Sequence, residues 1–221
     1  IAFVSSGTPE ALHALATLTA THRQHEPGDA DVICALGGDG FYGDGGHGSV
    51  FVIAPGQTYG DAIFDGQGFA TPTDSSVIPA GLTADNLILR NGVRAVASEI
   101  AVGTLRVESG ATLTHAPQSE AGLTIDVQRL VVESGAAIDV TGRGYLGGGR
   151  SGLTDGFAHT LGFAAGAGRG TGGSHGGSGG AYASNGGRVT NSLYGDPRRP
   201  TTLGAGGGEW GGAGGDGGGA I

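Results

Sequence analysis

The chain has 221 residues, of which 50 are glycine, and it contains neither methionine nor lysine. Its formal net charge is -9 and arginine supplies all 11 positive charges, which excludes the basic stripe needed to bind a nucleic-acid backbone. No apolar run approaches the length of a membrane-spanning helix, so we expect no membrane span in this chain. Cys34 is the only cysteine, which excludes an intramolecular disulfide.

Residues 1–41 have the pattern of a strand, a helix and a second strand. Ile1–Val4 is a short apolar run, and leucines recur at helical spacing between Leu12 and Leu18. Asp31–Leu36 is an almost wholly apolar strand that ends in the turn Gly37–Gly40, where glycine permits close backbone approach to a ligand. We expect a short β-α-β segment here.

The opening IAFVSSGTPEALHALATLT, followed by ADVICALGGDGF, closely resembles the N-terminus of bacterial NAD kinases. The resemblance implies that the GGDG turn, Gly37, Gly38, Asp39 and Gly40, binds nucleotide. It also implies that Asp39 is the catalytic base toward the ribose hydroxyl, that ATP and NAD are bound, and that the protein is cytoplasmic. The resemblance stops at residue 41, and no other motif of that family is recognisable.

Beyond Ser49 the sequence has the texture of a β protein. Short apolar runs are separated by Gly, Pro, Asp and Asn; they are Val50–Ile53, Ala62–Phe64, Leu87–Leu89 and Ile100–Val102. LRVESGATLTH at residues 105–115 then recurs as LVVESGAAIDV at residues 130–140, a repeat of 25 residues. A fixed period of this length predicts stacked coils whose inward apolar side chains form one column.

The repeat predicts a core and a set of corners. The predicted core residues are Leu105, Val107, Leu113, Ile125, Val127, Leu130, Val132, Ile138 and Val140. The corners would be Glu108–Gly110 and Glu133–Gly135, with both glutamates facing solvent. Two aligned glutamates could alternatively bind a cation.

Glycine is concentrated at the C-terminal end, where 31 of the 50 glycines lie between residues 142 and 219. Residues 84–221, with ESGAAIDVTGRGYLGGG and the glycine tracts after it, resemble segments of very large, adhesin-like bacterial surface or secreted proteins. That resemblance implies a β-helix with ordered glycine-rich loops, anchored by the regularly placed Tyr145, Tyr182, Tyr194 and Trp210. It also implies that further β-helix coils of the parent chain follow Ile221.

The expected fold class is therefore mainly β, a right-handed parallel β-helix (solenoid) with glycine-rich ordered loops, preceded by the short β-α-β segment. Four parts are predicted. Residues 1–41 are a fragment similar to NAD kinase, residues 42–83 a β-rich connecting or capping segment, residues 84–141 the β-helix coils, and residues 142–221 a glycine-rich region packed on the β-helix.

Other candidate sites depend on carboxylates. GGDGFYGDGGHG superficially resembles glycine-aspartate calcium repeats, which makes Asp39 and Asp44 weak calcium candidates in a chain where we otherwise predict no metal. Asp126, Glu133 and Asp139 are close enough in sequence to suggest the carboxylate pair of a polysaccharide-cleaving enzyme. Positions that follow apolar residues in a strand face solvent, however, which favours solvated side chains.

These observations predict a non-catalytic structural or binding module of a large bacterial cell-surface or secreted protein. Its location would be extracellular or on the cell surface, its partner a surface glycan or a protein, and no cofactor is expected. Two alternatives remain: a nucleotide-binding fragment similar to NAD kinase that phosphorylates NAD with ATP, and a polysaccharide-active β-helix.

Overall fold

The computed structural model describes residues 2–5, 12–13, 15–16, 19–20, 33–36, 48–54, 56–66, 75–150, 157–181 and 190–221. The chain divides into two compact units. Unit 1 is Ile1–Thr114 with Ile125–Asp139, and unit 2 is His115–Thr124 with Val140–Ile221. The four parts predicted from the sequence, with boundaries after residues 41, 83 and 141, stay predictions.

The N-terminal segment of unit 1 contains a pair of parallel strands. Strand β1 (Ala2–Ser5) pairs in parallel with β2 (Ile33–Leu36), and helical residues occur between them at 12–13, 15–16 and 19–20. The order of strand, helix and strand predicted for this segment is therefore present among the described residues.

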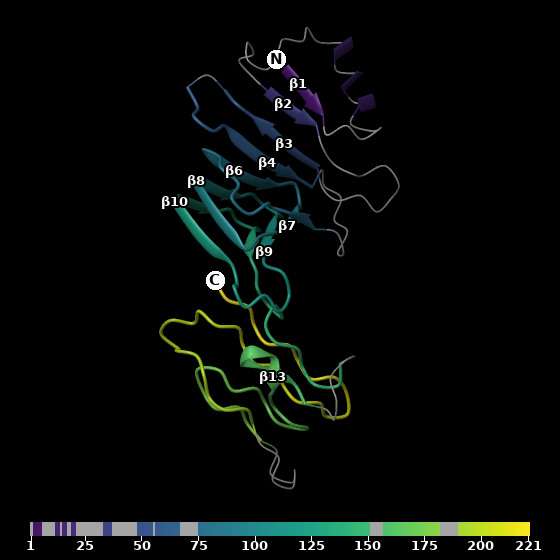
Figure 1. Cartoon of the computed structure of the whole chain (residues 1–221), viewed down its shortest axis with the longest axis vertical. Helices are drawn as coiled ribbons and strands as arrows, with labels where there is room; N and C mark the ends of the chain where they lie inside the picture. Colours follow the sequence, from purple (N-terminus) through teal and green to yellow (C-terminus); the bar gives the residue numbers. More distant parts are fainter. Residues whose placement is uncertain are drawn as a thin grey trace. The chain divides into compact units, whose positions relative to one another are not determined.

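A five-stranded sheet forms one wall of unit 1 (Figure 1). Its strands are β3 (Gly48–Val52), β4 (Asp61–Asp65), β6 (Asn86–Arg90), β8 (Glu99–Val107) and β10 (Thr124–Val132). The order is β10-β8-β6-β4-β3. The β3–β4 pair is antiparallel, whereas β4 pairs with β6, and β6 with β8, in parallel. The sheet is therefore mixed.

A second, four-stranded sheet has the order β11-β9-β7-β5. It consists of β5 (Ser76–Val77), β7 (Arg94–Val96), β9 (Thr112–Thr114) and β11 (Ala137–Ile138), and each neighbouring pair is parallel. Leu113 lies beside Ile138, as the 25-residue repeat predicted. The same offset joins β4 to β6, whereas β6 to β8 and β7 to β9 are offset by 18 residues.

The core of unit 1 consists of aliphatic side chains that alternate along the strands. Leu87 and Leu89 of β6 and Leu105 and Val107 of β8 are fully buried, and each is flanked by more exposed residues. Burying one such side chain contributes about 1.5–3 kcal/mol to the free energy of unfolding. Apolar side chains shared between neighbouring strands therefore hold unit 1 together.

The predicted core residues of the second repeat copy are not buried in the same way. Leu130 is 47% exposed and Val132 is 43% exposed, whereas Leu105 and Val107 at the equivalent positions of the first copy are inaccessible. Ile125, Val127, Ile138 and Val140 are half-buried. The reason is position, because β10 and β11 are the last strands of their sheets and no described strand follows them.

Unit 2 contains few strands. The antiparallel pair β12 (His159–Thr160) and β13 (Ala164–Ala165) flanks the short 3-10 turn η2 (Leu161–Phe163). Most other described residues of unit 2 belong to no strand and are linked by backbone hydrogen bonds. Three segments among them, residues 144–148, 204–208 and 214–218, form what we call the glycine bundle.

Each segment of the glycine bundle bonds to the other two with a period of three residues. Between the first two segments, the N–H groups of Tyr145 and Gly148 donate to Gly204 O and Gly207 O. Between the second and third, Gly204 and Gly207 donate to Gly218 O and Gly215 O. The third pair repeats the spacing, with Gly214 and Gly217 donating to Gly148 O and Tyr145 O. A period of three is the repeat of the polyproline II helix, and it allows one segment to bond to several neighbours around its axis.

Close approach of the three segments explains why they contain so much glycine. A Cβ on Gly147 would overlap the backbone of Gly214, and a Cβ on Gly217 would overlap the backbone of Gly204. Neither glycine has a positive φ, so the requirement is for space and not for an unusual backbone conformation. This is the constraint that places glycine at the crowded axis of collagen.

The predicted fold class, a right-handed parallel β-helix with glycine-rich loops, is therefore wrong for this chain. The structure is mixed, with helical residues, several separate sheets that include both parallel and antiparallel strand pairs, and a second unit largely without strands. The physical reason is that a stacked coil needs inward apolar side chains, which glycine cannot supply. The glycine-rich segments instead hydrogen-bond directly to one another.

The aromatic anchors predicted in the glycine-rich part divide into two groups. Tyr145 is 1% exposed and packs with Leu203, Ala220 and the half-buried Tyr194. Trp210 is 61% exposed, so its predicted role as an anchor is wrong. Tyr182 lies outside the described residues.

Candidate functional site

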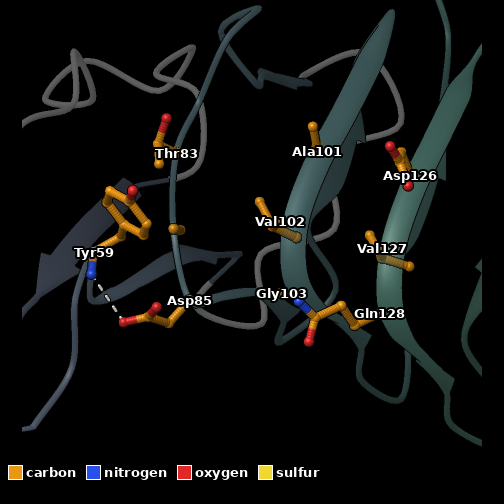
Figure 2. A pocket seen from close by; sticks show the side chains of 10 residues that line it. Tyr59, Thr83, Asp85, Ala101, Val102, Gly103, Asp126, Val127 and Gln128 are labelled. Carbon is orange, nitrogen blue, oxygen red and sulfur yellow. Dashed lines mark hydrogen bonds between the residues drawn. The ribbon is translucent and has the colours of Figure 1, made fainter.

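An open cleft of about 410 Å³ lies in unit 1, on the side of the five-stranded sheet where β6 begins (Figure 2). Tyr59 comes from the segment between β3 and β4, and Thr83–Asp85 immediately precede β6. Ala101–Gly103 belong to β8, and Asp126–Gln128 belong to β10. The cleft therefore crosses several neighbouring strands.

Asp85 organises one wall of the cleft. Its Oδ2 atom accepts hydrogen bonds from the backbone N–H groups of Thr58, Tyr59 and Gly60, each at 2.9 Å. Three successive amides converging on one oxygen form an anion-binding concavity of the kind made by turns. Gly60 has a φ of +80°, and a Cβ there would lie 2.6 Å from Val52 O, so the turn requires glycine. The turn is thereby attached to the strand that follows Asp85.

These hydrogen bonds determine the charge state of Asp85. The amides of Tyr59 and Gly60, and to a smaller extent that of Thr58, lower the pKa of the Asp85 carboxyl, although desolvation opposes them. Asp85 is therefore a carboxylate at neutral pH and carries no proton to donate. All three bonds end on Oδ2, and Oδ1 accepts none from the described residues.

The floor of the cleft depends on a glycine in β8. A Cβ on Gly103 would lie 2.6 Å from the backbone oxygen of Asp85, so β8 can approach only because this residue has no side chain. The N–H of Thr104 then donates to the same oxygen at 2.9 Å. The alternation of buried and exposed residues along β8 shifts by one residue at Gly103. Ile100 and Val102 are buried before it, and Leu105 and Val107 after it.

The opposite wall of the cleft carries the polar side chains of Asp126 and Gln128. The side chains of Asp126 and Gln128 are exposed and make no hydrogen bond or ion pair with the residues that the structure describes. Tyr59 is 53% exposed, and Figure 2 shows its ring on the cleft wall. Among the described residues that line the cleft there is no arginine or histidine, and the charged ones are Asp85 and Asp126.

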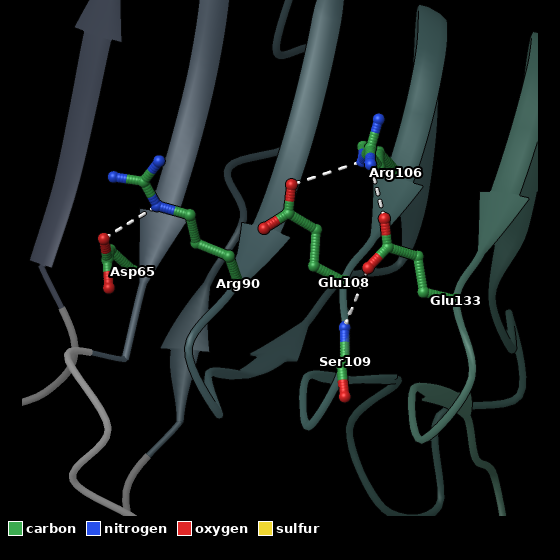
Figure 3. A network of polar contacts seen from close by, with 6 residues as sticks. All are labelled: Asp65, Arg90, Arg106, Glu108, Ser109 and Glu133. Atoms are coloured by element: carbon green, nitrogen blue, oxygen red, sulfur yellow. Dashed lines mark hydrogen bonds and ion pairs between the residues drawn. The ribbon is translucent and has the colours of Figure 1, made fainter.

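The carboxylates proposed from the sequence as a polysaccharide-cleaving set are not brought together at the cleft. Asp126 lines it, but neither Glu133 nor Asp139 does. Glu133 pairs instead with Arg106, which also lies 3.2 Å from Glu108 (Figure 3). The glutamates predicted simply to face solvent are therefore bridged by one arginine, which also accounts for them without a cation.

The same polar network includes a second ion pair. Arg90 Nε lies 2.8 Å from Asp65 Oδ2, and Asn91 Nδ2 donates to Asp65 Oδ1 at 2.8 Å (Figure 3). The paired residues belong to neighbouring strands or the turns beside them, so these contacts link successive strands on the solvent side. Their exposure limits each to about 0–1 kcal/mol.

The nucleotide and calcium candidates cannot be placed. Gly37, Gly38, Asp39, Gly40 and Asp44 all lie outside the described residues. Among the described residues, no cluster of three or more His, Cys, Asp or Glu side chains could hold a metal ion.

A fully buried histidine lies in unit 2. The His115 Nδ1 lies 2.8 Å from Ala116 O, and its Nε2 accepts a hydrogen bond from the Ala220 N–H at 3.3 Å. A Cβ on Gly219 would overlap its ring. Both ring nitrogens are thus used within the fold.

The chain matches no family model, no curated protein and no solved structure. Within the part of the chain that the structure describes, no helix has the length and apolar character needed to cross a membrane.

Sequence reasoning missed Tyr59 and Asp85. The signal that could have found them is the same 25-residue offset, because Asp61–Asp65 pairs with Asn86–Arg90 at that spacing. The repeat of residues 105–115 in residues 130–140, which we call the ESG repeat, could be extended toward the N-terminus. This extension would have aligned the turn before β4 with the residue before β6.

Proposed function

We propose that this chain is a non-catalytic structural or binding module of a large bacterial cell-surface or secreted protein. The observation that carries the proposal is the state of Asp85, whose carboxylate is occupied by three backbone amides and has a lowered pKa. The most organised polar group of the cleft is therefore ionised, fixes the shape of this surface and cannot act as a general acid.

Hydrolysis of a glycosidic bond would need different chemistry. A general acid with a raised pKa must face a second carboxylate across the scissile bond. Asp85 has its pKa shifted in the opposite direction, and the remaining carboxylate of the cleft, Asp126, is exposed. These features favour binding over cleavage and weaken the alternative of a polysaccharide-active enzyme.

The location at the cell surface is supported by the resemblance of residues 84–221 to adhesin-like proteins. Direct backbone bonding in the glycine bundle agrees with a structural role, because it orders a long segment that has few apolar side chains. In this proposal unit 1 provides the contact surface and unit 2 an ordered spacer.

The proposal is tested by incubating the purified chain with ATP and NAD, and separately with pectin, alginate and cellulose fragments. We expect no NADP and no new reducing ends by mass spectrometry, and a far-ultraviolet circular dichroism spectrum without a dominant helical signal. Surface labelling of intact producing cells, with a cytoplasmic protein as control, should modify Arg106 or Arg90. Turnover of any of these substrates would contradict the proposal. So would a chain whose Arg90 and Arg106 stay as unlabelled in intact cells as the cytoplasmic control protein.

A nucleotide-binding fragment is the second candidate. The parallel pairing of β1 with β2, with helical residues between them, favours it because phosphate-binding turns follow such strands. We expect millimolar ATP or NAD to slow hydrogen exchange at Gly37–Gly40 only if this candidate is right. Asp39→Asn should then abolish any NADP formation while leaving the exchange protection in place.

A further inference from the structure

We propose that the cleft of unit 1 binds an aliphatic ammonium group, either a lysine side chain of a partner protein or a free alkylamine. The inference rests on the proposed function as a binding module and names the ligand class of the same cleft. It follows from the charge, the aromatic wall and the shape of that surface.

The negative charge of the cleft favours a positively charged ligand. Asp85 and Asp126 line the cleft, none of its described lining residues is basic, and the whole chain carries a net charge of -9. Such a surface repels anions and raises the local concentration of cations. Both carboxylates are acceptors only, whereas an alkylammonium offers three donors and no acceptor. The polar groups of the cleft and of the ligand are therefore complementary.

Two free acceptor positions are available to that ligand. The backbone amides occupy Oδ2 of Asp85, and Oδ1 accepts no bond from the described residues. Asp126 has no partner within the described part of the chain. The Asp85 carboxylate is also held in place, so no side-chain freedom is lost there when a cation binds.

Tyr59 and the neighbouring strands supply the remaining contacts. Tyr59 is 53% exposed and its ring lies on the wall of the cleft, where the face of such a ring attracts an ammonium or the CH₂ group beside it. Ala101 and Val127 form apolar surface along β8 and β10 that suits a methylene stem. The volume of about 410 Å³ accommodates one extended side chain.

The test measures binding by NMR titration with Nα-acetyl-lysine methylamide and with Nα-acetyl-norleucine methylamide, which lacks only the ammonium. We expect the lysine compound alone to shift the amides of residues 58–60 and 101–103, and to bind more weakly as NaCl is raised. Cadaverine distinguishes the source, because equal binding indicates a free amine and weaker binding indicates a lysine within a polypeptide.

Variants locate the site. Asp126→Asn and Tyr59→Ala should each weaken binding by about two- to fivefold, as expected for one exposed ion pair or cation–π contact. Glu99→Gln removes the same charge from β8 outside the cleft and should leave the affinity unchanged. Circular dichroism spectra identical to that of the parent chain confirm that each variant is folded.

The outcomes separate this inference from the function on which it rests. Equal binding of the two amides, no binding of the amine at millimolar concentration, or full affinity in Asp126→Asn would overturn the ammonium site. Binding of cellobiose without binding of the amine would overturn it as well, yet leave the binding module intact. Chemical conversion of either compound would instead contradict the non-catalytic function.

Discussion

Unit 1 and unit 2 are ordered by different interactions. In unit 1, aliphatic side chains such as Leu87 and Leu105 are buried between paired strands. In unit 2, the backbones of residues 144–148, 204–208 and 214–218 bond directly to one another, and the described apolar cluster is small, with Tyr145, Leu203 and Ala220 at its centre.

The two units should therefore respond oppositely to added and removed atoms. Removing a methyl group from unit 1 leaves a cavity, because apolar volume stabilises it. Adding a methyl group to the glycine bundle forces backbones apart, because closeness stabilises it. Substitutions in each unit test this contrast.

Leu105→Ala should reduce the free energy of unfolding of unit 1 by about 3 kcal/mol, because this side chain is inaccessible and its removal leaves a cavity. Leu130→Ala, at the equivalent position of the second repeat copy, should cost less than about 1 kcal/mol because Leu130 is 47% exposed. Urea titration followed by segment-resolved hydrogen exchange measures both. Equal losses would show that β10 is covered in solution.

Gly217→Ala should destabilise unit 2 by about 2 kcal/mol, because the new Cβ overlaps the backbone of Gly204. The matched control is Gly218→Ala, since a Cβ there meets nothing within 4 Å and neither glycine has a positive φ. Hydrogen exchange at residues 204–208 reports the effect. If the two variants exchange equally fast, the glycine bundle does not depend on close approach.

Tyr145 should make unit 2 sensitive to alkali. Burial, and then the hydrogen bond to Glu120, raise the pKa of Tyr145 to about 12. Because this folded-state pKa exceeds the unfolded value of about 10, the contribution is complete below pH 10 and is lost as the pH rises through 12. Thermal unfolding between pH 8 and 12 should show a smaller alkaline loss in Tyr145→Phe, and an unchanged loss would exclude Tyr145 as its source.

Asp85 should produce the opposite dependence in unit 1. The pKa of its carboxyl is lowered mainly by the amides of Tyr59 and Gly60, so its contribution is complete above the unfolded pKa and disappears as the pH falls through the folded value. Asp85→Asn should therefore lower the melting temperature at pH 7 and match the parent chain in strong acid. A difference that persists at the lowest pH would point to packing instead of charge.

Arg106→Gln should have the smallest effect. The guanidinium bridges Glu108 and Glu133, but its side chain is 48% exposed, so we expect a loss below about 1 kcal/mol at low salt. The loss should shrink further at high NaCl because exposed charges are screened. Chemical unfolding at two salt concentrations decides the matter, and a large loss independent of salt would assign Arg106 a packing role.

Parts of the fold were predictable because they depend on local pattern. The runs at Ala62–Phe64 and Leu87–Leu89 form strands, and the ESG repeat is paired at its 25-residue offset. What pattern could not provide was the direction of the β3–β4 pair, which is antiparallel. Strand direction depends on how the intervening turn folds, and an apolar run has the same pattern in a parallel pair as in an antiparallel pair.

The candidate site was predicted less well than the strands. Asp126 was identified as one of several carboxylates, but its association with Tyr59 and Asp85 was not, because these residues are distant in sequence. Asp85 gives no local sign that three amides of a preceding turn will converge on it. Only the pairing of β4 with β6 brings the turn and the carboxylate together.

Which segments can bury side chains follows from the residue types alone, because aliphatic runs extend up to Val140 and glycine tracts follow it. How the backbone N–H and C=O groups of the glycine tracts are hydrogen-bonded is evident only in the folded chain. These bonds repeat every three residues and join segments as distant in sequence as Tyr145 and Gly217. Glycine has no side chain whose size or polarity would indicate which segment it contacts. The position of a glycine tract is therefore defined only when other backbone segments approach it.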